Sequence, residues 1–377
     1  MQPKPERFPS LDVFRGMTIC FMIIVNTPGS GAQAFAPLEH AGWHGFTPTD
    51  LVFPSFLFAV GNAMSFSIDR YRLQGNRPFL SKVIRRTLLI FLLGYLMYWF
   101  PFFRLDHAHH IVGAPISHTR IMGVLQRIAL CYFFASLLIH FLSSKAVTII
   151  SILLLVGYWI LLLLFGDSSQ PYSILGNAGL YLDKFLMGND HLYHGEGIPF
   201  DPEGWLSTLP AIVNVIIGYR AGKYIQRNGK NESTISHLLL IGLLLVFIAL
   251  CWNMAFPINK KLWTSSFVLL TSGIDLCIIC SLLYMIEIKR RSREGWVRFF
   301  EIPGKNPLFI YLLSELMVTI LFMIPVGNDS LFDAINSAVF QPLAPGPVGS
   351  LLFALCYMMF CWFIAWVLDK NRVYVRV

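Results

Sequence analysis

Ten long apolar runs, separated by polar segments, constrain the fold of this 377-residue chain more than any other feature. A helix needs about 20 apolar residues to cross the roughly 30 Å hydrocarbon layer of a bilayer. Hydrophobic side chains make up 55% of the chain and charged ones 13%, which excludes an ordinary soluble domain. The runs lie at 13–29, 51–68, 87–103, 121–142, 146–165, 207–222, 236–256, 262–286, 306–325 and 349–368.

These runs predict an all-α, polytopic integral membrane protein of about ten transmembrane helices that forms one domain over residues 1–377. In lipid, backbone N–H and C=O groups must hydrogen-bond to each other, which only helices and closed β-barrels allow. The runs are too long for barrel strands, so we expect helices. Most of the 29 lysines and arginines fall in every second loop. The positive-inside rule therefore predicts that both termini are cytoplasmic. The net charge of +8 follows from this topology, so we expect no nucleic-acid partner.

Histidines and cysteines are distributed unequally along the chain. All seven cysteines lie in apolar runs, where we expect them to pack as small hydrophobic residues without disulfides. Most histidines lie in loops that the topology places outside, which favours proton handling on that side. These are His40, His44, His107, His109, His110, His118, His191 and His194. The cluster from Asp106 to His110 resembles metal spacing only loosely, so we expect a solvated loop and no metal site.

Several helices carry residues that are costly in hydrocarbon, namely Asp50, Arg127, Asp275 and Glu315. Such groups either face an internal cavity or form a structural ion pair, for example between Arg127 and a carboxylate. The outer loop from 166 to 206 combines carboxylates with tyrosine and tryptophan. That mixture suits a cationic or sugar-like ligand, and it is equally compatible with a solvated loop.

The chain resembles the heparan-alpha-glucosaminide N-acetyltransferase family of transmembrane acetyltransferases. The resemblance rests on ordered blocks from Ser10 to about Asn306 and is more specific than any single motif. The blocks include residues 10–16 (SLDVFRG), 25–26 (VN), 40–43 (HAGW), 50–54 (DLVFP), 120–127 (RIMGVLQR), 190–193 (DHLY), 200–204 (FDPEG), 221–223 (AGK), 259–263 (NKKLW) and 303–306 (PGKN).

The resemblance implies an enzyme that moves acetyl from cytosolic acetyl-CoA to the amine of a glucosamine unit outside. It also implies that His40 is catalytic, that Asn26 and Asp50 are site residues, and that the protein is a homodimer. Because the chain begins at the first family helix, we expect a bacterial-type member without the luminal N-terminal domain, in the plasma (inner) membrane. Ser314 stands where animal relatives are expected to have histidine, so the resemblance does not identify the acceptor amine.

Acyl transfer to an amine agrees with these residue types. A protonated amine has no lone pair, so the reaction needs a base with a pKa near 6 to 7 at the acceptor. His40 suits this role, Asp50 can orient its imidazole, and Asn26 can donate to the developing oxyanion. An acetyl-histidine intermediate is the other route. His44 lies outside the matched residues and is interpreted as a loop residue.

The phosphates of CoA require cations, and the inner basic loops are where we expect them to bind. The candidates are Arg15, Arg85, Arg86 and Lys305. The competing interpretation is a transporter for amino sugars or cell-wall fragments, since intramembrane acids occur on proton pathways. Transporters often contain an internal repeat, and no second copy of the 26–50 pattern is evident.

Overall fold

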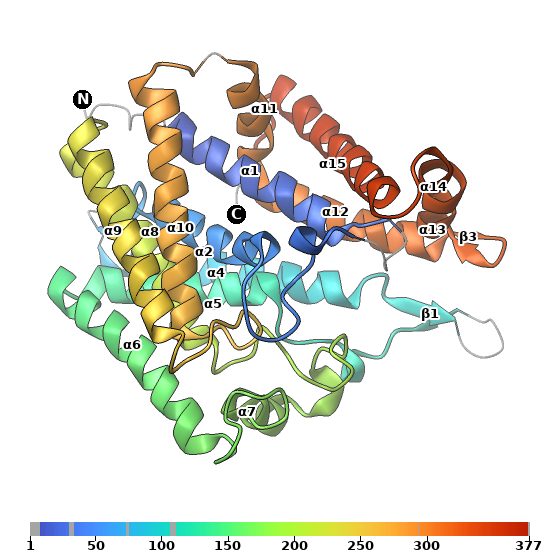
Figure 1. The fold of residues 1–377 in the computed structure, drawn as a ribbon, viewed down its shortest axis with the longest axis horizontal. Coiled ribbons are helices and arrows are strands. Elements are labelled where there is room, and N and C mark those ends of the chain that lie inside the picture. The colour runs from blue at the N-terminus through green and yellow to red at the C-terminus, as the bar shows by residue number, and fades with distance from the viewer. Residues whose placement is uncertain (1–7, 30–33, 73–74, 106–110, 293, 376–377) are drawn as a thin grey trace. The chain divides into compact units, whose positions relative to one another are not determined.

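The computed structural model describes residues 8–29, 34–72, 75–105, 111–292 and 294–375, and these are predominantly helical (Figure 1). Two short antiparallel strand pairs, β1 (Phe103–Leu105) with β2 (Ile111–Gly113) and β3 (Pro325–Val326) with β4 (Asp329–Ser330), interrupt the all-α architecture that we predicted. The main helices are α1 (Pro9–Asn26), α2 (Val52–Met64), α4 (Asn76–Trp99), α5 (Val124–Phe141), α6 (Ser144–Phe165), α7 (Ala178–Met187), α8 (Thr208–Asn228), α9 (Glu232–Trp252), α10 (Ser265–Leu282), α11 (Gly295–Gly304), α12 (Pro307–Met323) and α15 (Pro347–Lys370).

Each of the ten apolar runs overlaps one of these helices, but the helices differ in their ability to cross a bilayer. Within the described residues, six are long and apolar enough, or seven if the bent pair α11 and α12 is one span. These six are α1, α5, α6, α9, α15 and the helix from Ser265 to Ile288. By contrast, α2 has only 13 residues, and α4 and α8 carry clustered cations. The chain is therefore a multi-pass membrane protein, and ten spans with cytoplasmic termini remain a prediction.

Packing divides the chain into two compact units. Unit 1 comprises residues 1–41, 47–52 and 281–376, and unit 2 comprises residues 42–46 and 53–280, with Val377. The segment between the first two apolar runs is thus shared: His40 and Asp50 belong to unit 1, and Trp43 and His44 belong to unit 2.

In unit 1, α1 packs against α11, α12 and α15 (Figure 1). Two glycines allow α1 and α11 to approach at backbone distance. A Cβ atom on Gly16 would lie 1.7 Å from the carbonyl oxygen of Phe300, and one on Gly304 would lie 1.8 Å from that of Asp12. Small residues permit such close helix crossings in membranes. The crossing fixes α1, whose C-terminal end leads into the loop that carries His40.

In unit 2, a second glycine pair brings α2 and α8 together. A Cβ atom on Gly61 would lie 1.8 Å from the carbonyl oxygen of Val215, and one on Gly218 would lie 2.0 Å from that of Phe58. Around this crossing, α5 packs on α4 and α8, and α6 packs on α8. Trp263 and Phe267 lie fully buried in the core of the unit.

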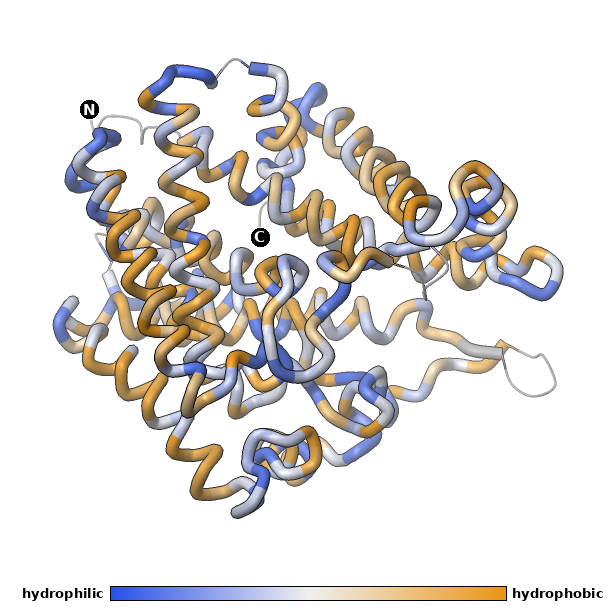
Figure 2. The backbone as a smooth tube through the Cα atoms, in the orientation of Figure 1, coloured by the Kyte–Doolittle hydropathy of each residue, from blue (hydrophilic) through white to orange (hydrophobic). Residues whose placement is uncertain are grey.

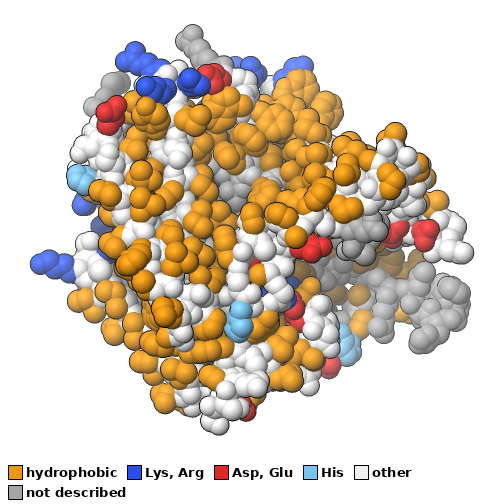
Figure 3. All heavy atoms as spheres, viewed as in Figure 1, with side chains coloured by type: hydrophobic (Ala, Val, Ile, Leu, Met, Phe, Trp, Pro, Cys, Tyr) orange, Lys and Arg blue, Asp and Glu red, His pale blue; other side chains and the backbone are white. Residues whose placement is uncertain are grey.

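The outer faces of α6 and α9 are apolar. Both helices are hydrophobic along most of their length (Figure 2), and hydrophobic side chains cover the surface over them (Figure 3). Their exposed residues include Ile152, Leu164, Leu240 and Phe247. Exposed apolar patches of this extent are explained by contact with lipid.

Inside unit 2, the polar residues that we expected within helices are buried. Asp275 is fully buried, and Oδ1 of its carboxyl group accepts a hydrogen bond from Ser55 at 2.6 Å. Arg127 is also fully buried, but its Nη2 donates to the carbonyl oxygen of Gly204 at 3.0 Å and to the hydroxyl of Ser207. Nη2 of Arg127 is therefore hydrogen-bonded to a carbonyl and a hydroxyl, and not to the carboxylate that we considered.

Candidate active site

His40 and Asp50 contact each other directly in unit 1. Nδ1 of His40 lies 2.8 Å from Oδ1 of Asp50. Because an ionised carboxylate can only accept a hydrogen bond, Nδ1 carries the proton, and Nε2 is the unprotonated nitrogen of the neutral imidazole. The His40 side chain is 42% exposed and that of Asp50 is 1% exposed. The imidazole side chain thus remains partly accessible while its partner is buried.

The carboxylate of Asp50 is held by the loop that it closes. Asp50 lies in a 3-10 turn, Pro48–Leu51, immediately before α2. Its Oδ2 accepts hydrogen bonds from the backbone N–H of Ala41 at 3.2 Å, from that of Thr47 at 2.9 Å and from the Thr47 hydroxyl at 3.2 Å. The Thr47 hydroxyl also lies 2.7 Å from the carbonyl oxygen of Glu39. With one oxygen fixed by three donors, the other oxygen is positioned to orient His40.

Asn26 lies at the end of α1 in the same unit and pairs with α12. Its Nδ2 donates to Oε1 of Glu315 at 3.2 Å. An amide has two N–H groups, so this bond leaves one donor for another acceptor. The neighbouring Ser314 is buried, and its hydroxyl donates to the carbonyl oxygen of Tyr311 at 2.8 Å.

The four residues predicted to bind CoA are divided between the two units. Arg15 and Lys305 belong to unit 1, next to the glycines at the crossing of α1 and α11, whereas Arg85 and Arg86 lie on α4 in unit 2. Arg15 forms an ion pair with Asp12, and its buried Nε has no hydrogen-bond partner among the residues that the structure describes. Lys305 forms ion pairs with Glu301 at 3.3 Å and Asp369 at 3.0 Å.

On α4, Arg86 stacks over the Tyr132 ring at 4.8 Å, and Arg85 is exposed. All four cations therefore stay candidates for phosphate binding. Lys305 and Arg15 also have structural roles, because each already forms an ion pair with a carboxylate of its own unit.

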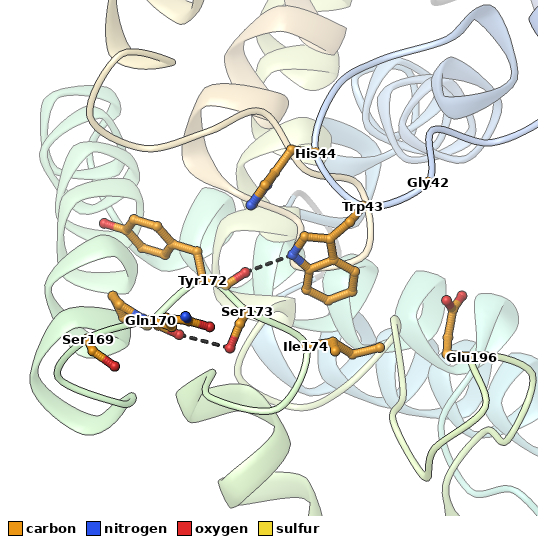
Figure 4. Close-up of a pocket in the computed structure, with 10 residues that line it drawn as sticks. Gly42, Trp43, His44, Ser169, Gln170, Tyr172, Ser173, Ile174 and Glu196 are labelled. Atoms are coloured by element: carbon orange, nitrogen blue, oxygen red, sulfur yellow. Dashed lines mark hydrogen bonds between the residues drawn. The ribbon is translucent and has the colours of Figure 1, made fainter.

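Unit 2 contains an open cavity of about 710 Å³ (Figure 4). Its lining combines Gly42, Trp43 and His44 with the 169–174 loop and Glu196. The indole N–H of Trp43 donates to the carbonyl oxygen of Tyr172 at 2.8 Å, which joins the two walls. Asn259 donates to Nδ1 of His44 at 3.3 Å, and burial lowers the pKa of His44. The neutral His44 ring therefore carries its proton on Nε2.

A buried ion cluster supports the loops of unit 2. Arg120 donates from Nη2 and Nε to both oxygens of Asp201, at 2.7 and 3.0 Å, and from Nη2 to Glu203 at 2.5 Å. Its guanidinium also lies over the rings of Tyr98 and Tyr193, at 4.9 and 4.7 Å. Burial opposes ionisation, but Arg120 and Arg127 hold the pKa of Glu203 below its usual value. The contacts tie the start of α5 to the loop before α8.

The model of the heparan-alpha-glucosaminide N-acetyltransferase catalytic family matches residues 7–250, which include the His40–Asp50 pair and the ion cluster. The chain belongs to this family. Human heparan-alpha-glucosaminide N-acetyltransferase is 28% identical over 367 residues, covering 82% of this chain and 53% of the human protein. The mouse protein of the same name is 27% identical, covering 83% of this chain and 54% of its own length. The chain thus spans about half the length of these curated relatives.

Family membership confirms the resemblance that the sequence blocks indicated. The roles of individual residues in this N-acetyltransferase family member stay proposals. Sequence reasoning missed Glu315 as the partner of Asn26 and treated His44 as an ordinary loop residue. It singled out the outer loop from 166 to 206 for a cationic or sugar-like ligand, but it did not identify residues 169–174 within that loop as the part that lines the cavity. The Asp106–His110 cluster lies outside the described residues.

Proposed function

We propose that this protein is an acetyl-CoA-dependent N-acetyltransferase that acetylates the amine of a glucosamine-type sugar across the membrane. The observation that carries the proposal is the pairing of His40 with the buried Asp50 in a chain of this family. A histidine whose Nδ1–H is held by a carboxylate presents a basic Nε2, which is the group that amine acylation requires.

The chemistry assigned to His40 is proton removal at the attacking nitrogen. The acceptor ammonium gives a proton to Nε2, and the free amine attacks the thioester carbonyl carbon. The carbon–nitrogen bond forms, the carbon–sulfur bond breaks, and CoA leaves as the thiol after taking a proton. Asp50 stabilises the imidazolium that forms in between. The second N–H of Asn26 is available for the developing oxyanion.

The same Nε2 lone pair also allows a two-step route. In that route His40 attacks the thioester first, and the acetyl group then passes from the imidazole to the amine. Both routes need the Nδ1–Asp50 contact. They differ in whether acetyl-CoA alone leaves a label on the protein, so an acid-quench experiment without acceptor separates them.

The membrane-spanning helices and the loop histidines support transfer from one side of the bilayer to the other. On the topology predicted from the cation distribution, the His40 loop is exterior and the basic segments that hold Arg85, Arg86 and Lys305 are cytoplasmic. Acetyl-CoA would then bind at the cytoplasmic side. We further propose a homodimer in the plasma membrane, in keeping with the family resemblance.

The test is acetyl transfer by the full chain in sealed liposomes. Radiolabelled acetyl-CoA is enclosed inside or supplied outside, and glucosamine is supplied on the other side. We expect labelled N-acetylglucosamine only when the two substrates face the sides that the topology assigns. Binding of acetyl-CoA without any acetylated amino sugar would refute the proposed acceptor. Absence of acetyl-CoA binding, with amino-sugar uptake, would favour a transporter.

A further inference from the structure

An apolar groove of about 420 Å³ lies between α5, α6 and α8 of unit 2. Apart from Trp205 and Thr208, its lining consists of leucine, isoleucine and phenylalanine side chains. The hydroxyl of Thr208 donates to the carbonyl oxygen of Gly204 at 3.0 Å, so its proton is already used. A ligand in this groove is therefore held by apolar contact.

The length of the groove matches one leaflet of a bilayer. Its lining extends along α5 from Leu130 to Leu138. Between these residues the helix rises about 12 Å, at about 1.5 Å per residue, which is close to half of a roughly 30 Å hydrocarbon layer. Both α5 and α6 are long and apolar enough to span the bilayer, so the groove lies beside hydrocarbon. A single acyl chain has the length and the apolar character that fit it.

Two arginines are fixed at one end of the groove, where α5 and α6 form a hairpin around a short turn (Figure 1). Arg72, the last residue of α3 (Ile68–Arg72), donates to the carbonyl oxygen of Ile139, which directly follows a lining residue of α5. Arg220 of α8 donates to the hydroxyl of Thr148 at 2.7 Å, two residues before a lining residue of α6. Both guanidinium groups thus lie beside the same end of the groove.

This end of the groove carries an excess of positive charge. Arg72 and Arg220 donate here from Nη2 to uncharged oxygens, and an arginine has five N–H groups, so each keeps donors for an anion. Lys145, in the first turn of α6, adds an exposed cation. The carboxylate of α3, Asp69, is already paired with Lys223. An anionic group that enters here finds cations within reach.

We infer that the groove and these three cations form a binding site for an anionic phospholipid, with its phosphate at Arg72, Lys145 and Arg220 and one acyl chain in the groove. Basic pockets between transmembrane helices bind lipid headgroups in this way. On the topology predicted from the cation distribution, this end is cytoplasmic, so the ligand is a lipid of the inner leaflet. The site lies wholly in unit 2, and its occupancy does not depend on the proposed acetyl transfer.

Lipid binding by the full chain tests the inference. The delipidated protein in detergent is titrated with phosphatidylglycerol, with phosphatidylcholine and with glycerol phosphate, and bound molecules are counted by native mass spectrometry. We expect one phosphatidylglycerol per chain, bound at least about tenfold more tightly than phosphatidylcholine, because only the former has a net negative charge. Equal affinity for the two lipids would overturn the inference. Glycerol phosphate that binds as tightly as phosphatidylglycerol would also overturn it, because the acyl chain would then contribute nothing.

Two matched pairs of variants test the two parts of the site. Lys145→Gln should weaken phosphatidylglycerol binding about three- to tenfold, whereas Lys184→Gln, which removes a charge on α7, should not. Ile150→Trp fills the groove and should weaken binding at least about tenfold. Ile152→Trp makes the same change at a 55% exposed position outside the lining and should have no effect.

Unfolding midpoints show whether the filled groove leaves the fold intact, and Leu154→Phe is the second filling variant if Ile150→Trp does not fold. Equal lipid binding by a folded filling variant and by Ile152→Trp would refute the acyl-chain site. A dimer that forms without lipid and is broken by Ile150→Trp would show that a second copy of the chain covers the groove, which would also overturn the inference.

Discussion

Oδ1 of Asp50 lies 2.8 Å from Nδ1 of His40, and Oδ2 of Asp50 accepts three hydrogen bonds from Ala41 and Thr47. One buried carboxylate therefore closes the loop and orients the imidazole. These two roles of Asp50 depend on the same group, so they should fail together when the carboxylate is changed.

Asp50→Asn tests this dual role. The amide keeps one oxygen, so it cannot accept hydrogen bonds from His40 on one side and from three loop donors on the other. We expect the turnover rate to fall about a hundredfold or more, because the histidine loses its orienting charge. Stability should fall by ~1–3 kcal/mol, because buried donors lose their partner. Turnover and the thermal unfolding midpoint are measured on the same preparation. A variant with normal turnover would show that Asp50 is only structural.

Arg120→Met should strongly destabilise unit 2. It leaves Asp201 and Glu203 buried without their cation, and breaking a buried ion pair in this way costs ~3–5 kcal/mol. The triple variant Arg120→Met, Asp201→Asn, Glu203→Gln removes all three charges and should recover most of the loss. The measurement is the unfolding midpoint in detergent. If the triple variant were no more stable than Arg120→Met, the charge imbalance would not be the cause.

Asp183 should make stability depend on pH. It is buried in α7, where burial raises its pKa to about 7 although the N–H of Trp205 donates to it at 2.9 Å. In the unfolded chain the pKa of an aspartate is about 3.9. Between these values the folded state holds a proton that the unfolded state has lost. Stability attributable to Asp183 is therefore present below about pH 4 and declines as the pH rises to about 7, by up to ~1.4 kcal/mol per pH unit.

Asp183→Asn should remove this part of the pH dependence, because the amide resembles the neutral acid and cannot titrate. Unfolding midpoints between pH 4.5 and 7.5 are compared with those of the wild type and of Asp190→Asn, which changes an exposed carboxylate. Parallel pH profiles for Asp183→Asn and the wild type would show that Asp183 is ionised throughout the range.

Gly304→Ala should separate α1 from α11. The added methyl carbon would lie 1.8 Å from the carbonyl oxygen of Asp12, so the two backbones must move apart. We expect a loss of ~1–3 kcal/mol from overpacking. Gly295→Ala lies on the same helix, and no described atom is within 4 Å of the added carbon, so it should be neutral or stabilising. Equal unfolding midpoints for the two variants would contradict the close crossing.

The sequence predicts the helices well because apolar length is a local property. Each of the ten runs overlaps a helix, and Asp50 was expected to orient His40 because the family resemblance made both of them site residues, ten positions apart. Pairings between distant segments are different. Asn26 with Glu315 and Arg120 with Asp201 join residues that are far apart in the chain, and no periodicity in either segment encodes the partner.

The basic residues show a second limit of sequence reasoning. Lys305 was a candidate for CoA because it lies in a positive loop and in a matched block. In the structure its ammonium group is shared by Glu301 and Asp369, which belong to α11 and α15. A cation in a sequence does not reveal whether a ligand or a neighbouring carboxylate balances it. The outer loop from 166 to 206 was expected to suit a ligand, but its pairing with residues 42–44 in one cavity was not, because the walls come from separate segments.

The most direct test of the proposed chemistry is acetyl transfer to glucosamine by His40→Ala. The control is His118→Ala, which removes a loop histidine whose side chain is 60% exposed. Both variants are first checked for acetyl-CoA binding and for an unchanged unfolding midpoint. We predict that His40→Ala lowers the transfer rate at least about a hundredfold, the contribution expected of a general base, whereas His118→Ala is unaffected. Transfer at the wild-type rate by His40→Ala would contradict the assignment of His40 as the base or nucleophile.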